Sequence, residues 1–141
     1  MNKLILIVLL IVAAGVIVYA GGKRGSSSKP EPGSSKSAVY RKISPAEAHK
    51  MMSESKDYVL LDVRTKEEHS EKHISGAVLI PVDVLEARAE KELPDKKAVI
   101  LVYCRSGRRS ASAAHTLLKL GYENVYDFGG INSWPYETVS K

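Results

Sequence analysis

Cys104 is the only cysteine of the 141-residue chain, and its surroundings favour a reactive thiolate. The apolar stretch 98–103 before it is typical of a buried strand, and a helix is expected to begin within residues 108–110. In an open parallel sheet, ligands bind at the carboxyl ends of the strands. The cysteine therefore stands where a ligand would bind, in a turn that leads into a helix.

The turn after Cys104 has the composition of an anion-binding loop. Backbone N–H groups converge at a helix N-terminus and bind anions, and Gly107 allows the backbone angle that such a turn needs. Three arginines within five residues add positive charge that favours the thiolate. The candidate site residues are the catalytic Cys104 and the substrate-binding Arg105, Ser106, Gly107, Arg108 and Arg109. Arg109, at the helix start, is expected to point at the bound anion.

Composition and charge exclude several classes of protein. One cysteine excludes an intramolecular disulfide framework and a zinc site built on several thiolates, and no metal site is expected. The chain has 21 basic and 16 acidic residues, a net charge of +5. Before Ala38, five basic residues and one acidic residue give +4, which leaves +1 for the rest. Because a nucleic-acid surface would place this excess on the folded domain, no nucleic-acid partner is expected.

Residues 4–22 are predicted to contact a membrane. They are almost entirely apolar, carry no charge, and would span about 28 Å as a helix, enough to cross a bilayer core. Basic residues stand on both sides of the segment, so the side of the membrane that holds the domain stays open. A retained anchor in a bacterial-type cell membrane is favoured. Cleavage after Ala20 would instead make the domain secreted or periplasmic.

The chain is expected to have three parts. Residues 1–24 form the transmembrane anchor or signal segment, and residues 25–38 form a flexible linker rich in Gly, Ser, Pro and Lys. Residues 39–141 form the folded domain. One ordinary domain fills this length, so a second domain is not expected.

Strand and helix patterns alternate along the folded part. Strands are expected over 58–63, 77–80, 98–103 and 124–127. Helices are expected to begin at Pro45, after Thr65, after Asp83 and after the cysteine turn, the first three at S/T/D-x-x-E capping patterns. The order predicts an α/β fold with a mostly parallel sheet and helices on both faces, preceded by one hydrophobic N-terminal helix.

About residues 40 to 134 resemble the rhodanese homology domain, a family of sulfurtransferases. The resemblance rests on motifs in order along the chain: LLDVR (60–64) with Glu68, HISGA (73–77) with Ile80-Pro81, CRSGRRS (104–110), GY and NVY within 121–126, and GGI and SW within 129–134. It implies a parallel five-stranded sheet with helices on both faces. It also implies that Asp62 and Arg64 support the site without binding the substrate, the aspartate bracing it through hydrogen bonds or an ion pair.

The activity that the resemblance implies is sulfane-sulfur transfer through a covalent persulfide on Cys104, with no other cofactor. A small anionic donor such as thiosulfate would supply the sulfur, and a thiol, cyanide or a protein would accept it. An alternative is a persulfide carrier or docking module for a membrane partner, with little turnover of small donors. A phosphatase is not favoured, because the turn from Cys104 to Arg109 is short for a tetrahedral phosphate.

Overall fold

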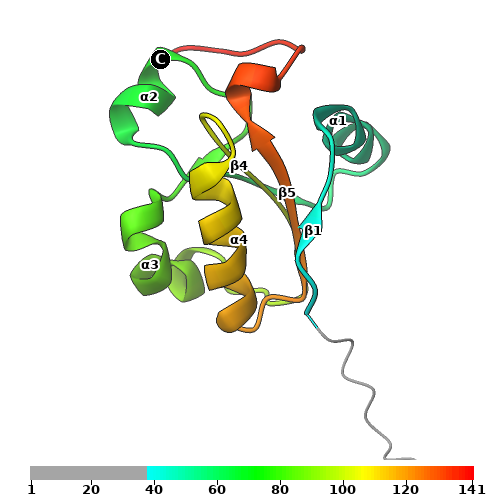
Figure 1. Ribbon diagram of the computed structural model, residues 1–141, viewed down its shortest axis with the longest axis vertical. Coiled ribbons are helices and arrows are strands. Elements are labelled where there is room, and N and C mark those ends of the chain that lie inside the picture. The colour runs from blue at the N-terminus through cyan, green and yellow to red at the C-terminus, as the bar shows by residue number, and fades with distance from the viewer. Residues whose placement is uncertain (1–37) are drawn as a thin grey trace, which may run out of the picture. The chain divides into compact units, whose positions relative to one another are not determined.

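The computed structural model describes residues 38–141, which form an α/β fold around one parallel sheet (Figure 1). The five strands lie in the order β1-β5-β4-β2-β3. Their bounds are β1 Arg41–Lys42, β2 Val59–Asp62, β3 Val78–Leu79, β4 Val99–Cys104 and β5 Asn124–Gly130. The predicted parallel five-stranded α/β fold is confirmed. The predicted hydrophobic N-terminal helix lies outside the described residues.

Residues 38–141 also form four α-helices and two short 3₁₀ helices, the last of which follows β5. Their bounds are α1 Pro45–Glu54, α2 Lys66–Glu71, η1 Val82–Val84, α3 Leu85–Glu92, α4 Arg108–Lys119 and η2 Ile131–Ser133. Within residues 38–141, no helix has the length and apolar character needed to span a membrane. The segment 4–22, for which a membrane contact was predicted, is not among these residues.

Capping boxes begin α1 and α2 as the sequence predicts. Ser44 accepts a hydrogen bond from the Glu47 backbone, and the Glu47 side chain accepts one from Ser44 in return. Thr65 and Glu68 make the same pair of bonds at α2. Each box satisfies two backbone N–H groups that the first helical turn leaves free.

The predicted cap of the third helix at Asp83 is wrong. Residues 82–84 form the 3₁₀ turn η1, and α3 begins only at Leu85, with no side chain capping its first turn. The turn follows Pro81, whose carbonyl accepts a hydrogen bond from the backbone N–H of Val84. This tighter turn places the buried Leu85 in the core.

The two faces of the sheet are covered by different helices. Alternate side chains of β4 point to opposite faces, so Ile100, Val102 and Cys104 pack in a cluster that also contains buried residues of α3 and α4. Leu101 and Tyr103 pack in the other cluster, which includes Ala48 of α1. Figure 1 shows α3 and α4 on one side of β5 and α1 on the other. Strand β4, between β5 and β2, is therefore buried on both faces.

Candidate active site

The fold places Cys104 at the carboxyl end of the central strand. Tyr103 is in register with Asp62 of β2, and Cys104 is in register with Gly130 of β5 after a shift in the pairing. Strand β5 extends to Gly130, beyond the predicted range 124–127, and so reaches the cysteine. The turn after Cys104 thus lies against two neighbouring strand ends, as predicted for a ligand-binding edge.

The sulfur of Cys104 is buried but has polar neighbours. The residue is 1% exposed and belongs to the apolar cluster under α3 and α4. Within residues 38–141, its Sγ has two hydrogen-bonding partners, the backbone N–H of Gly107 at 3.0 Å and the Ser110 hydroxyl at 3.6 Å. The Gly107 N–H can stabilise negative charge on the sulfur, because hydrogen bonds to an ionised acceptor are strong.

Two glycines allow the turn to close over the sulfur. Gly107 has φ +105° and is the N-cap of α4, a left-handed conformation that disfavours other residues. Gly130 lies so close to the turn that an added Cβ would overlap the Arg105 carbonyl oxygen and the Ser106 Cα. The backbone N–H of Asn132 donates to that same Arg105 carbonyl at 3.2 Å. The end of β5 therefore fixes the turn from one side.

Gly130→Ala is expected to lower the free energy of unfolding by about 1–3 kcal/mol, because the new methyl group must displace backbone. Urea unfolding measures the loss. Ser106→Ala changes an exposed side chain of the same turn and should stay within about 0.5 kcal/mol of the original chain. A Gly130→Ala variant as stable as Ser106→Ala would contradict the close contact between Gly130 and the cysteine turn.

Arg109, which is expected to point at a bound anion, pairs with Glu68 of α2 in the structure. The guanidinium makes two hydrogen bonds to the Glu68 carboxylate, at 2.7 and 2.8 Å. This pairing with Arg109 is the main cause that lowers the pKa of Glu68 to about 2. The pKa of Arg109 is raised, chiefly by Glu68, with smaller contributions from Cys104 and Asp62. Glu68 was part of the family motif but was not predicted as a site residue.

Three further predicted binding residues lie in or next to the turn and make no hydrogen bond to the sulfur. They are Arg105, Ser106 and Arg108, and all three are exposed. Within residues 38–141, Arg105 and Arg108 have no ion-pair partner. Their positive charge therefore faces solvent at the mouth of the turn. The same described residues hold no group of three or more His, Cys, Asp or Glu side chains suited to a metal ion.

Asp62 and Arg64, both expected to support the site, form a buried ion pair with each other. The Arg64 guanidinium donates to Asp62 Oδ2 at 2.6 Å and to the Lys72 carbonyl at 2.7 Å. Burial raises the pKa of Asp62, but hydrogen bonds from Arg64 and His69 outweigh it and leave the pKa below its usual value. The pair joins the end of β2 to the end of α2.

The carboxylate of Asp62 also holds Tyr103, the residue before the cysteine. The Tyr103 hydroxyl donates to Asp62 Oδ2 at 2.9 Å and accepts from the Ile74 backbone N–H at 3.2 Å. Because Tyr103 points to the face opposite Cys104, Asp62 positions the strand end and does not touch the sulfur.

Ser110 and His69 are site residues that the sequence did not predict. Ser110 is the sixth residue after Cys104, and its buried hydroxyl also contacts the Gly107 and Gly129 carbonyls. His69 is 4% exposed, and its Nδ1 lies 2.9 Å from Asp62 Oδ2. Ser110 could be found from its place inside the loop motif. No spacing signal links His69 to Asp62, seven residues earlier in the chain.

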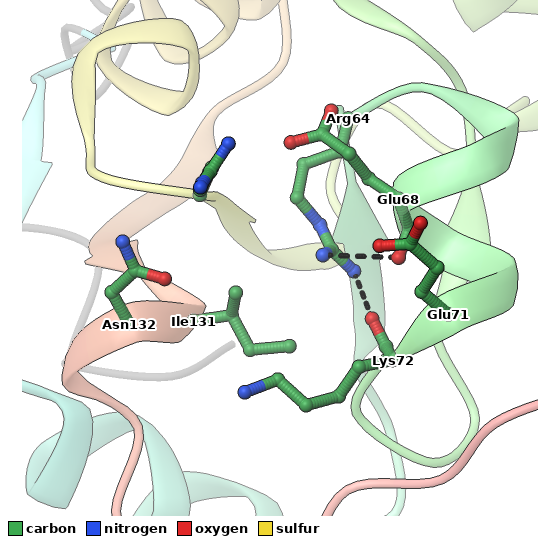
Figure 2. Close-up of a pocket in the computed structure, with 7 residues that line it drawn as sticks. Arg64, Glu68, Glu71, Lys72, Ile131 and Asn132 are labelled. Carbon is green, nitrogen blue, oxygen red and sulfur yellow. Dashed lines mark hydrogen bonds between the residues drawn. The ribbon is translucent and has the colours of Figure 1, made fainter.

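A pocket of about 170 Å³ adjoins the turn, and we call it the loop-side pocket (Figure 2). It lies between α2 and the turn at the end of β5. Its lining residues are Arg64, Glu68, Glu71, Lys72, Arg105, Ile131 and Asn132. It contains side chains of both charge signs, among them Arg105, the residue that follows the cysteine.

Parallel strands with helices on both faces, and a cysteine in a tight turn at the carboxyl edge of the sheet, define a rhodanese-type site. Residues 44–136 match the family of rhodanese-like domains. The chain belongs to this family. The prediction of a rhodanese-like enzyme is confirmed by its relatives.

Two curated relatives are named thiosulfate sulfurtransferases. PspE of Escherichia coli is 37% identical over 71 residues, which cover 50% of this chain and 68% of the relative. GlpE of Coxiella burnetii is 35% identical over 97 residues, which cover 68% of this chain and 88% of the relative. Sulfur transfer is therefore the activity of the family members that this chain resembles.

Two solved structures have the same fold. A rhodanese with anions from E. coli is 32% identical with a TM-score of 0.56, over 60% of this chain and 99% of that one. A rhodanese-like domain protein from Staphylococcus aureus is 31% identical with a TM-score of 0.61, over 72% of this chain and 98% of that one. The likeness thus spans nearly the whole of each of these two solved structures.

Proposed function

We propose that the chain transfers sulfane sulfur from an anionic donor such as thiosulfate to a thiophilic acceptor through a persulfide on Cys104. The observation that carries this function is the position of Cys104 Sγ, which accepts a hydrogen bond from the Gly107 N–H in a turn rich in arginine. Such a site stabilises anionic sulfur before and after transfer. No further cofactor is part of the proposal.

Two half-reactions account for the transfer. In the first, the Cys104 thiolate attacks the outer sulfur of thiosulfate, the sulfur–sulfur bond of the donor breaks, and sulfite leaves with the electron pair. In the second, a thiol, cyanide or protein acceptor takes the outer sulfur and Cys104 leaves as a thiolate. The Gly107 N–H is placed to donate to the anionic sulfur in both steps, and the Ser110 hydroxyl, which accepts from the Cys104 thiol, lies 3.6 Å from it.

Access to the sulfur requires a local movement. Because Cys104 is 1% exposed, neighbouring side chains must shift before a donor reaches its Sγ. The exposed side chains of Arg105 and Arg108 can attract an anion to the turn before this shift. The Arg109–Glu68 pair is only partly buried, at 32% and 22% exposure, so it can rearrange toward a bound anion.

Steady-state turnover of thiosulfate and cyanide tests the proposed function. Two covalent half-reactions predict ping-pong kinetics, seen as parallel lines in double-reciprocal plots. Sulfur uptake at one atom per chain without turnover would favour the alternative, a persulfide carrier. Hydrolysis of a phosphate ester in place of sulfur transfer would support the phosphatase, which the short turn from Cys104 to Arg109 disfavours.

Substitutions of the two residues of the Arg109–Glu68 pair are expected to change the KM for thiosulfate in opposite directions. Glu68→Gln removes negative charge beside the turn and frees Arg109, so the KM for thiosulfate should fall about two- to fivefold. Glutamine at this position can keep the capping box of α2. Arg109→Ala should weaken donor binding by about 1–3 kcal/mol, the size of a charged hydrogen bond, and raise KM about fivefold or more.

Glu67→Gln is the matched control for the charge effect. Glu67 is exposed on the same helix and forms no ion pair within residues 38–141. The KM of this variant should stay close to that of the original chain. A rise in KM for Glu68→Gln, or full donor affinity in Arg109→Ala, would show that Arg109 does not bind the donor.

The proposal also includes attachment of the domain to a membrane. Residues 4–22 are the membrane segment, residues 25–38 the tether, and residues 39–141 the domain, in a bacterial-type cell membrane. The intact mass of the chain, extracted from membranes washed at high pH, tests this arrangement. A chain that lacks its first 20 residues and leaves the membrane fraction would instead indicate cleavage after Ala20 and a secreted or periplasmic domain.

A further inference from the structure

The loop-side pocket contains three charges that the protein itself does not neutralise. Within residues 38–141, Arg64 is paired with Asp62 and Glu68 with Arg109. The charges of Glu71, Lys72 and Arg105 have no partner among the ion pairs or side-chain hydrogen bonds of this part of the chain. One negative and two positive charges are therefore available to a ligand.

These charges lie on different walls of the pocket. Figure 2 shows the Lys72 side chain extending beneath Ile131, with its ammonium well separated from the Glu71 carboxylate. Arg105 belongs to the cysteine turn, and its carbonyl accepts from the Asn132 backbone. A ligand that contacts both walls meets opposite charges at its two ends.

We propose that the loop-side pocket selects a small zwitterionic α-amino thiol as the sulfur acceptor. The inference rests on the proposed sulfur transfer through Cys104 and deepens it by naming the class of acceptor. Glu71 would bind the ammonium group, and Lys72 and Arg105 would bind the carboxylate and attract the thiolate. The ligand as a thiolate has one positive and two negative charges, which complement those left free in the pocket.

The size and the remaining lining residues fit such a ligand. A volume of about 170 Å³ lies below the range of about 300–1,000 Å³ that is usual for drug-sized ligands. The buried Ile131 offers an apolar surface for a short methylene chain, and the Asn132 amide can donate and accept hydrogen bonds. A small amino thiol uses every one of these features, whereas cyanide uses almost none.

The transfer step is balanced without an oxidant or a reductant. The acceptor thiolate attacks the outer sulfur of the Cys104 persulfide, forming one sulfur–sulfur bond and breaking another. The electron pair of the broken bond stays on Cys104, which becomes a thiolate. The acceptor leaves as a persulfide carrying the transferred sulfur and its proton.

Three thiols that differ by one charged group test this inference. The chain is first treated with thiosulfate, and the mass of its Cys104 peptide shows that the sulfur is bound. Transfer is then timed with L-cysteine, with 3-mercaptopropionate, which lacks the ammonium, and with cysteamine, which lacks the carboxylate, all at equal thiolate concentration. L-cysteine should react fastest, by about two- to fivefold over each analogue, the worth of one partly exposed charge contact.

Two variants assign this preference to the pocket. Glu71→Gln should abolish the preference for L-cysteine over 3-mercaptopropionate, and Lys72→Gln should reduce the preference over cysteamine. Lys50→Gln and Glu54→Gln, an exposed pair on α1, remove the same charges elsewhere and should leave both ratios unchanged.

Each outcome decides between the two proposals. Equal rates with the three thiols, or ratios that Glu71→Gln and Lys72→Gln do not move, would overturn the selection of a zwitterion while sulfur transfer stands. A chain that never takes up sulfur on Cys104 would overturn both.

Discussion

Cys104→Ser is expected to abolish sulfur transfer while the fold stays intact. A serine hydroxyl cannot form a persulfide, so neither half-reaction can start. The smaller oxygen can still accept from the Gly107 N–H, which lies 3.0 Å from the sulfur, and the residue stays buried. Steady-state release of thiocyanate from thiosulfate and cyanide measures the loss, and urea unfolding measures the stability.

Ser110→Ala serves as the matched control for this variant. It removes the hydroxyl that lies 3.6 Å from the same sulfur but leaves the nucleophile in place. We expect reduced but measurable transfer. Transfer by Cys104→Ser at a rate comparable to that of Ser110→Ala would show that another group carries the sulfur.

Asp62→Ala is expected to lower the free energy of unfolding by about 3–5 kcal/mol, because it leaves the buried Arg64 guanidinium without its counter-charge. Arg64 is 3% exposed, and Asp62 is fully buried. The variant also removes the acceptor of the Tyr103 hydroxyl, so the strand end that bears Cys104 loses its anchor. Urea unfolding at neutral pH measures the loss.

The control for Asp62→Ala is Glu90→Ala, which breaks an exposed ion pair with Lys96. It should lower the free energy of unfolding by about 1 kcal/mol or less, as the loss of a surface pair does.

The hydrogen bonds that hold the pKa of Asp62 below its usual value also set the pH dependence of its contribution to stability. The contribution of Asp62 is full above the usual aspartate range and is lost as the pH falls through the lowered pKa. The difference in the free energy of unfolding between Asp62→Ala and the original chain should therefore shrink in acid. Equal losses for Asp62→Ala and Glu90→Ala at neutral pH would contradict a buried ion pair.

Local sequence signals predicted most of the fold. Pro45 and Thr65 mark capping boxes, which depend on contacts within four residues, and both helices begin there. The cap at Asp83 does not form because residues 82–84 make a 3₁₀ turn, which the capping pattern does not reveal. Strand β1 has two residues, too few for an alternating pattern, and it exists because it pairs with the distant Tyr126 and Asp127.

The sequence reveals contacts within the cysteine turn more readily than contacts beyond it. Gly107 contacts the sulfur because the two residues are three apart in one turn, which is visible in the sequence. The pairing of Arg109 with Glu68 joins residues 41 positions apart, and no spacing rule reports it. The placement of Asp62 on the face opposite Cys104 follows from strand alternation only once the register of β2 and β4 is known.

The mass of the peptide that contains Cys104, measured after treatment with thiosulfate, tests the central claim most directly. We predict a gain equal to the mass of one sulfur atom on this residue, and its loss when cyanide is added. An unchanged mass, with the Cys104 thiol still free after prolonged treatment, would contradict the account.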